Sequence, residues 1–151
     1  AVLRLRPATV EDARLLFEGR NAEPVRRWSQ QPEALEWPDH VRWLEAAVND
    51  PQRLLLIAEI AAGAVGVLRY DRQGVQVDVS IYLFAEHLGL GWGRTLLEQG
   101  EAWLVRHWPD VQRLGARVLA ENQVSLTLFR RAGYCQAPCE FTRVLKEHLD
   151  D

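Results

Sequence analysis

The sequence of 151 residues contains no apolar run of the roughly 18 to 20 residues that a membrane-spanning helix needs. Arg4 and Arg6 interrupt the N-terminal region where the apolar stretch of a signal peptide would lie. An excess of basic residues is also absent, because 18 Lys and Arg against 21 Asp and Glu give a net charge of −3. The chain therefore lacks the global charge of a nucleic-acid binder. These absences predict a cytoplasmic protein that binds neither membranes nor nucleic acid.

Cysteine is scarce, since Cys135 and Cys139 are the only two in the chain. No second cysteine pair or histidine pair follows at zinc-finger spacing, so a structural metal site is not expected. A local disulfide between the two is geometrically conceivable. In a chain of this size without a secretion signal, two reduced structural thiols are the favoured interpretation.

Internal repeats and low-complexity tracts are absent, and the glycines and prolines fall singly between periodic segments. The composition, with 48% hydrophobic and 26% charged residues, is that of an ordinary globular protein. A chain of this length buries roughly two thirds of its unfolded surface, which is enough for one sizeable core. We therefore predict a single domain over residues 1–151.

Hydrophobic periodicity predicts the order of the secondary structure. The expected elements are a strand at 2–6, a helix from about 9 to 18 that Gly19 ends, a helix at 38–49, strands at 54–59, 64–70 and 75–83, a helix from 93 to about 108, a strand at 113–119, a helix that Asn122 caps and Gly133 ends, and strands at 134–136 and 141–145. This order predicts an α+β fold, or α/β sandwich, in which helices flank a mixed sheet.

The strand at 75–83 has the most regular pattern in the chain. Its apolar residues alternate with Gln76, Asp78, Ser80 and Tyr82. Because successive side chains of a strand point to opposite faces, one face is expected in the core and the other is free to carry chemistry.

A glycine-rich turn joins this strand to the next helix. Residues 87–93 read His-Leu-Gly-Leu-Gly-Trp-Gly, with Gly89, Gly91 and Gly93 at alternate positions. Glycines permit positive φ and close approach of the backbone, so that successive N–H groups can converge on an anion at the positive end of a helix. The spacing fits neither the dinucleotide fingerprint nor a nucleotide P-loop. From the turn alone, phosphate binding and a merely tight connection are equally good interpretations.

This turn resembles the acetyl-CoA-binding motif of the GNAT superfamily of acetyltransferases, Gln/Arg-x-x-Gly-x-Gly/Ala. Leu88, Gly91 and Gly93 fall on its positions, so Leu88 replaces the leading Gln or Arg. A second segment, residues 121–134, looks like the family's Asn-x-x-Ser/Ala-x-x-Leu-Tyr/Phe-x-x-x-Gly-Phe pattern. The resemblance covers the whole chain in element order. It implies a GNAT fold, with a mixed, mostly antiparallel sheet that is flanked by helices and splayed between its fourth and fifth strands.

The resemblance also implies an acetyl-CoA-dependent N-acetyltransferase without a metal. An acceptor amine would attack the thioester, a backbone N–H of the fourth strand would stabilise the oxyanion, and the leaving thiolate must be protonated. Asn122 would hold the pantetheine, and it equally fits a second role as the cap of its own helix. The residues expected to contact acetyl-CoA are Ile81, Tyr82, Leu83, Leu88, Gly89, Gly91, Trp92, Gly93, Arg94, Asn122, Ser125 and Phe129.

The candidate catalytic residues are Asp78, Ser80 and Tyr134. Asp78 lies near the position where many GNAT enzymes carry a glutamate that deprotonates the amine, and a solvated strand-face carboxylate is an equally good interpretation. Many relatives have a tyrosine that acts as the general acid where this chain has Phe129, which cannot donate a proton. The acid is then Tyr134, a water held by Ser125 or bulk solvent. Tyr134 also aligns with a position that usually holds a packed phenylalanine.

The segment before the central hairpin is expected to shape the acceptor site. It is rich in tryptophan and arginine, which suit a planar base and a diphosphate. The alternative is that the tryptophans cover the core edge and the arginines are solvated. Its short motifs resemble the nucleotide-linked amino-sugar branch of the GNAT enzymes, closest in pattern to the UDP-4-amino-sugar N-acetyltransferases of pseudaminic acid biosynthesis. That resemblance implies substrate contacts by Arg20, Asn21, Trp28, His40 and Trp43.

Three functions stay open at this point. The first is N-acetylation of an amino sugar, with a sugar nucleotide as the favoured small-molecule acceptor. The second is acetylation of a protein α-amine or a polyamine, and the third is binding of CoA without turnover. An acidic groove would favour a cationic acceptor, whereas a pocket of arginine and tryptophan would favour the sugar nucleotide. Because dimers are common in the family, the resemblance allows a homodimer.

Overall fold

The computed structural model describes residues 2–22, 36–118, 122–137 and 140–145. Its strands are β1 (Arg4–Pro7), β2 (Arg53–Ile60), β3 (Gly63–Gln73), β4 (Gln76–Leu83), β5 (Arg113–Arg117), β6 (Cys135–Ala137) and β7 (Glu140–Val144). Its helices are α1 (Ala13–Asn21), α3 (Trp37–Asn49), α4 (Trp92–His107) and α5 (Gln123–Arg131), with short 3-10 turns at Val10–Asp12 and Ala85–His87.

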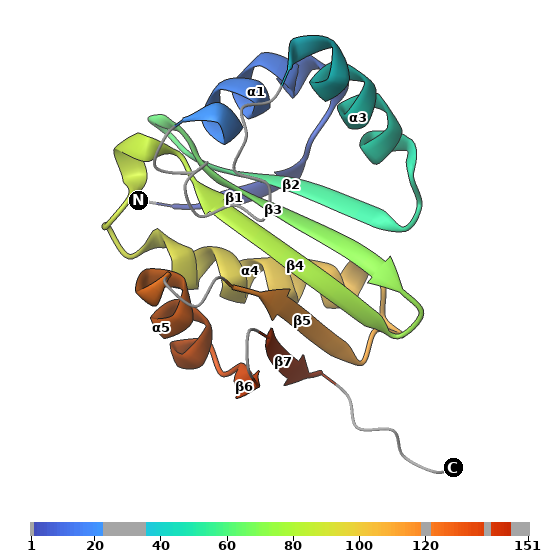
Figure 1. Cartoon of the computed structure of the whole chain (residues 1–151), viewed down its shortest axis with the longest axis vertical. Helices are drawn as coiled ribbons and strands as arrows, with labels where there is room; N and C mark the ends of the chain where they lie inside the picture. Colours follow the sequence, from blue (N-terminus) through green and yellow to red (C-terminus); the bar gives the residue numbers. More distant parts are fainter. Residues whose placement is uncertain (1, 23–35, 119–121, 138–139, 146–151) are drawn as a thin grey trace.

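The strands form one sheet in the order β1-β2-β3-β4-β5-β7-β6. All neighbouring pairs are antiparallel except β4 and β5, which are parallel. Helices α1 and α3 lie on one side of the sheet, and α4 and α5 lie on the other (Figure 1). This architecture confirms the predicted α+β sandwich with a mixed, mostly antiparallel sheet.

The parallel pair is short, and it sets the shape of the site. β4 and β5 pair only at Gln76 with Arg113, Val77 with Leu114 and Asp78 with Gly115. In the described strands, residues 79–83 of β4 have no partner in β5, and the two strands diverge beyond Asp78 (Figure 1). This divergence is the predicted splay.

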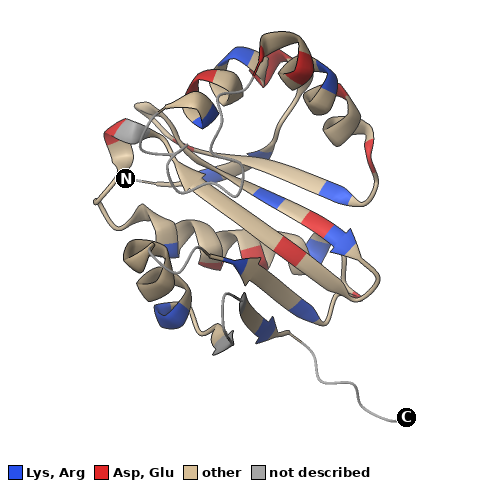
Figure 2. Cartoon of the chain, viewed as in Figure 1, with Lys and Arg blue, Asp and Glu red and all other residues tan. Residues whose placement is uncertain are grey.

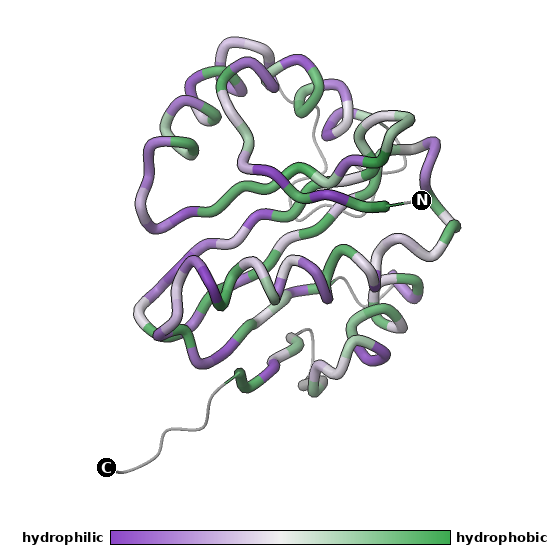
Figure 3. The backbone as a smooth tube through the Cα atoms, turned by 180° about the vertical axis from the view of Figure 1, so that it is seen from behind, coloured by the Kyte–Doolittle hydropathy of each residue, from purple (hydrophilic) through white to green (hydrophobic). Residues whose placement is uncertain are grey.

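The two sides of the sheet bury separate clusters of apolar side chains. Val77 and Val79 of β4 belong to the larger cluster beneath α4 and α5, whereas Tyr82 packs against the smaller cluster that contains Leu16 of α1 and Leu44 of α3. The backbone seen from behind shows polar and apolar residues alternating along the strands (Figure 3), and charged residues interrupt β3 and β4 (Figure 2). The α4 side of β4 is thus core. On the α1 and α3 side, Asp78 and Ser80 are exposed, and Tyr82 packs against the smaller cluster.

The helix that Gly19 was expected to end continues through it to Asn21. Gly19 is buried inside α1, where an added Cβ would overlap the ring of Phe84. Close packing of α1 on Phe84 therefore requires this glycine, and the prediction that Gly19 ends the helix is wrong.

Both predicted ends of α5 are confirmed. The side-chain oxygen of Asn122 accepts a hydrogen bond from the Ser125 backbone N–H at 3.2 Å, which caps the helix. Gly133 follows the helix with a φ of +91°, which favours glycine at this position. Cys135 is free and exposed, and Cys139 lies outside the described residues. The helices that the structure describes are too short or too polar to cross a lipid bilayer.

Candidate active site

Asp78 lies at the point where β4 and β5 part. It is the last residue of β4 that pairs with β5, opposite Gly115. Ser80 follows it on the same face of the strand, and both side chains are exposed. The structure therefore brings together these two predicted catalytic residues at the inner end of the opening between the strands.

Among the described residues, the backbone of β4 beyond this point has no strand partner on its β5 side. The side chains of Ile81 and Leu83 pack toward α4, and the side chain of Tyr82 packs toward α1 and α3. Backbone N–H and C=O groups at a free strand edge can pair with an extended ligand chain, as in strand addition. This edge can hold a linear, amide-containing molecule.

The glycine-rich turn lies at the open end of β4. Gly89 and Gly91 have φ of +76° and +83°, and an added Cβ would meet no atom within 4 Å at either position. Glycine is therefore required at both positions by the positive φ of the backbone and not by a shortage of room for a side chain. Gly91 is the N-cap of the 16-residue α4 and provides no side-chain cap. The first-turn N–H groups of α4 are left for an anion.

The third glycine of the turn has a different role. An added Cβ at the buried Gly93 would lie 3.0 Å from Cδ2 of Leu128, so this glycine lets α4 approach α5 closely. The flanking side chains differ in exposure, since Leu88 is exposed and Trp92 is half-buried. Arg94 is exposed, and its Nε donates to Glu98 Oε1 at 2.7 Å.

Phe129 lies in the larger core cluster, on the α4 side of the sheet. It is 3% exposed, stacks on Phe141 with ring centroids 5.5 Å apart and meets Tyr134 edge to face at 5.0 Å. Its environment is that of a packing residue.

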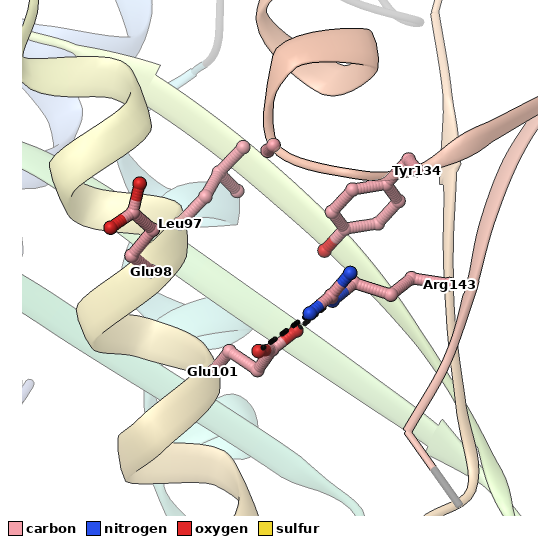
Figure 4. A pocket seen from close by; sticks show the side chains of 6 residues that line it. Leu97, Glu98, Glu101, Tyr134 and Arg143 are labelled. Carbon is pink, nitrogen blue, oxygen red and sulfur yellow. Dashed lines mark hydrogen bonds and ion pairs between the residues drawn. The ribbon is translucent and has the colours of Figure 1, made fainter.

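Tyr134 is not brought together with Asp78 and Ser80. Its ring is buried against Phe129, and its hydroxyl points toward the Glu101–Arg143 ion pair (Figure 4). These three residues line a cavity of about 260 Å³ on the α4 side of the sheet. Burial raises the pKa of the Tyr134 hydroxyl, so it holds its proton tightly. Packing is the role that these surroundings support.

His40 lies buried between α1 and α3. Its Nε2 donates to the Ala13 carbonyl oxygen at 2.9 Å, and its ring packs among the rings of Phe17, Trp37 and Trp43. Burial lowers the pKa of His40 below its ordinary value of 6.5, which favours the neutral ring. The structure thus shows His40 joining two helices, and a contact with substrate stays a prediction.

Of the remaining acceptor candidates, Trp43 lies beside β3. Trp43 is half-buried, and the Arg69 guanidinium carbon lies 5.8 Å from its ring centroid. Arg20 is half-buried in the last turn of α1, and burial lowers the pKa of its guanidinium. Asn21 is the half-buried last residue of α1, and Trp28 lies outside the described residues.

Sequence reasoning did not identify Arg69 as a site residue. The signal was present, because Arg69 is the one charged residue in the predicted strand at 64–70. Only the register of β3 with β4 shows that Arg69 stands opposite Ser80.

A model of the acetyltransferase (GNAT) domain family matches residues 3–134. The chain belongs to the GNAT family. It is an acetyltransferase with acetyl-CoA as its cosubstrate. No curated protein matches the chain in sequence.

Solved GNAT structures share the fold at low sequence identity. Spermidine N-acetyltransferase from Vibrio cholerae, in complex with CoA and spermine, aligns with a TM-score of 0.84 and 15% identity over 94% of this chain and 95% of that one. Aminoglycoside acetyltransferase AAC(6')-Ib, in complex with coenzyme A, gives 0.80 and 17% over 95% of each chain. A GNAT acetyltransferase from Streptococcus pneumoniae gives 0.74 and 17% over 96% and 100%. At these identities the likeness shows the fold.

The geometry fits the acetyl-CoA of a GNAT enzyme. The turn at Gly89 and Gly91 leaves uncapped N–H groups for phosphate oxygens, and the free edge of β4 suits the amide-containing pantetheine chain. A metal-binding group of three or more His, Cys, Asp or Glu side chains does not occur among the residues that the structure describes.

Proposed function

We propose that residues 1–151 form one acetyltransferase domain that moves an acetyl group to a primary amine of a small molecule at the opening between β4 and β5. One observation carries this proposal. Asp78 lies where the pairing of β4 with β5 stops. From there the edge of β4, which has no partner in β5, runs to the glycine-rich turn before α4. The strand edge proposed for the donor and an exposed polar face therefore meet at Asp78.

The chain's own residues have separate tasks in this proposal. The backbone at Ile81, Tyr82 and Leu83 pairs with the pantetheine, and the N–H groups at Gly89 to Arg94 hold the pyrophosphate. When bound, acetyl-CoA supplies a thioester carbonyl that is open to attack by an amine. A backbone N–H of β4 stabilises the negative charge that develops on that carbonyl oxygen.

Proton transfer falls to Asp78 and to solvent. Asp78 accepts a proton from the attacking amine, directly or through a water held with Ser80, because its carboxylate is exposed at the vertex. Phe129 has no proton to give, and the buried Tyr134 hydroxyl faces the other side of the sheet. We therefore assign the proton that the leaving thiolate takes up to water at the opening between β4 and β5.

Two acceptor classes have a specific basis. The similar structures include complexes with spermine and with kanamycin, both amines of high positive charge, which favours a polyamine or an aminoglycoside. The sequence resemblance favours a nucleotide-linked amino sugar, for which the comparisons give no support.

Acetyl-CoA-dependent thiol release, with mass spectrometry of the product, tests the proposal. The amines are spermidine, kanamycin, a UDP-4-amino sugar and an N-terminal peptide. We expect acetylation of a small-molecule amine, and Asp78→Asn should lower kcat by about 10²- to 10⁴-fold without changing the Kd of acetyl-CoA. Glu45→Gln, which removes an exposed carboxylate on α3, is the matched control. Binding of acetyl-CoA without acetylation of any amine would contradict the proposal.

A further inference from the structure

We propose that Arg69 is a positioning residue for proton transfer from the attacking amine to Asp78, and that it acts by fixing the direction of the Ser80 hydroxyl. This inference rests on the proposed acetyl transfer, because it gives Asp78 the neighbours with which it works as a base. Arg69 acts through Ser80 and does not itself touch the amine.

Strands β3 and β4 place four polar side chains together on the α1 and α3 side of the sheet. Asp71 stands opposite Asp78, and Arg69 stands opposite Ser80. Residues two apart on a strand share a face, so the two pairs are neighbouring rungs on the same face. The Cβ atoms of opposite residues lie about 4.5 to 5.5 Å apart, so each side chain can influence the one across from it.

Arg69 is held by two partners besides Ser80. Its Nε donates to Asp71 Oδ2 at 3.0 Å, and its guanidinium carbon lies 5.8 Å from the centroid of the Trp43 ring on α3. Toward β4, its Nη2 donates to the Ser80 hydroxyl oxygen at 3.4 Å. A planar guanidinium that is fixed in this way presents Nη2 to the hydroxyl in one direction.

The two carboxylates on this face have different surroundings. Asp71 lies between two arginines, with Oδ2 3.0 Å from Nε of Arg69 and Oδ1 3.4 Å from Nε of Arg53. Asp78 is exposed, and within the described part of the chain no hydrogen bond or ion pair joins its carboxylate to another residue. Asp71 therefore holds Arg69 in place, whereas the Asp78 carboxylate is left to accept a proton.

The contact with Arg69 decides where the Ser80 proton points. A guanidinium has only donors, so the Ser80 oxygen accepts in this pair and its own O–H turns away from Arg69. Arg69 lies on the β3 side of Ser80. On the other side is the opening, because β4 pairs with β5 only as far as Asp78 in the described strands. The Ser80 proton is therefore directed into the opening between β4 and β5.

One water can join Ser80 to Asp78. The two residues are about 7 Å apart along the strand, and two hydrogen bonds through one water link side-chain oxygens about 5.5 Å apart. When Ser80 donates to this water and Asp78 accepts from it, one lone pair of the water oxygen stays open to the amine. As the amine attacks the thioester carbon, a proton leaves its nitrogen for the water, and a water proton passes to the Asp78 carboxylate.

Steady-state kinetics of single and double variants test the inference, with the amine that is acetylated in the thiol-release assay. Arg69→Gln should lower kcat about 10-fold, the effect of one lost hydrogen bond, while the KM of the amine and the Kd of acetyl-CoA hold. Ser80→Ala should lower kcat at least as much. In the Ser80→Ala background, Arg69→Gln should have no further effect, because no hydroxyl is left to direct.

Further measurements distinguish positioning from support of the fold. The solvent deuterium isotope effect on kcat should be larger in Arg69→Gln than in the wild type, because slowed proton transfer then limits turnover. Arg69→Lys keeps the charge beside Asp71 and one donor group, and it should recover part of kcat. Arg53→Gln is the matched control, since it removes the other arginine of Asp71 and should leave kcat unchanged. Melting curves show whether each variant is folded. If Arg69→Gln does not fold, Arg69→Lys takes its place in the double variant.

The outcomes separate this inference from the proposed function. Wild-type kcat in the folded Arg69 variant, a raised KM for the amine alone, or losses that add in the double variant would each overturn the positioning role. A loss of kcat in Asp78→Asn would then leave the proposed function intact. If Asp78→Asn keeps its kcat, or if no amine is acetylated, the proposed function fails, and the inference fails with it.

Discussion

The Asp78 carboxylate lies over Gly115, at the last residue pair that joins β4 to β5. An added Cβ on Gly115 would sit 2.9 Å from Asp78 Oδ1, closer than real Cβ contacts. The absence of a side chain at Gly115 therefore leaves room for the Asp78 carboxylate where β4 and β5 part.

Gly115→Ala should displace this carboxylate. If Asp78 is the base, we expect kcat to fall by about 10²-fold, the low end of the range for a lost proton-transfer group. The Kd of acetyl-CoA should not change. In an Asp78→Asn background the same change should have no further effect on kcat. Additive losses in the double variant would show that Gly115 does not act through Asp78.

Gly91→Pro should abolish the anion site at the start of α4. Proline fixes φ near −65° and removes an N–H, whereas Gly91 adopts +83°. Each hydrogen bond to a charged group contributes about 1.5 to 3 kcal/mol, so displacing the turn should weaken acetyl-CoA binding by about 100-fold or more. Titration calorimetry measures the change. Gly91→Ala keeps the N–H and should weaken binding less. Undiminished binding in the proline variant would contradict the site.

Gly19→Ala should destabilise the protein by about 1 to 3 kcal/mol, the usual cost of overpacking. The added methyl group would push α1 away from Phe84. Urea denaturation measures the loss, and Gly19→Ala combined with Phe84→Leu should cost less than the sum of the single changes. A stable Gly19→Ala protein would mean that α1 shifts freely on the sheet.

His40 should make stability depend on pH below about 6.5. Burial lowers the pKa of His40 in the folded state below the 6.5 of an exposed histidine. The unfolded chain then takes up a proton first, so the contribution of neutral His40 is complete above pH 6.5 and is lost as pH falls toward the lowered pKa. The free energy of unfolding should therefore fall more steeply between pH 7 and 5 in the wild type than in His40→Gln. Equal slopes would contradict this burial effect.

Local patterns predicted much of the fold and part of the site. Alternation along residues 75–83 identified β4 and the exposed face of Asp78 and Ser80, because strand periodicity depends only on neighbouring residues. The Asn122 cap likewise follows from local chemistry. The β4–β5 splay followed from family resemblance, and the pairing of the two strands confirms it.

Features that depend on contacts distant in the sequence were missed. Gly19 has the local appearance of a helix end, but its contact with Phe84 decides its role. Arg69 acquires its place through Ser80 on β4 and Trp43 on α3. Tyr134 follows a GNAT motif, yet its hydroxyl faces Glu101 and Arg143 on the other side of the sheet. No periodicity in a single segment reports such pairings.

Hydrogen exchange of backbone amides with and without acetyl-CoA tests the central claim most directly, namely that the cosubstrate lies in the opening between β4 and β5. The account predicts added protection at residues 79–83 and 89–94, and little change around the cavity lined by Tyr134 and Arg143. Protection at that cavity, with none along β4 or the glycine turn, would contradict it.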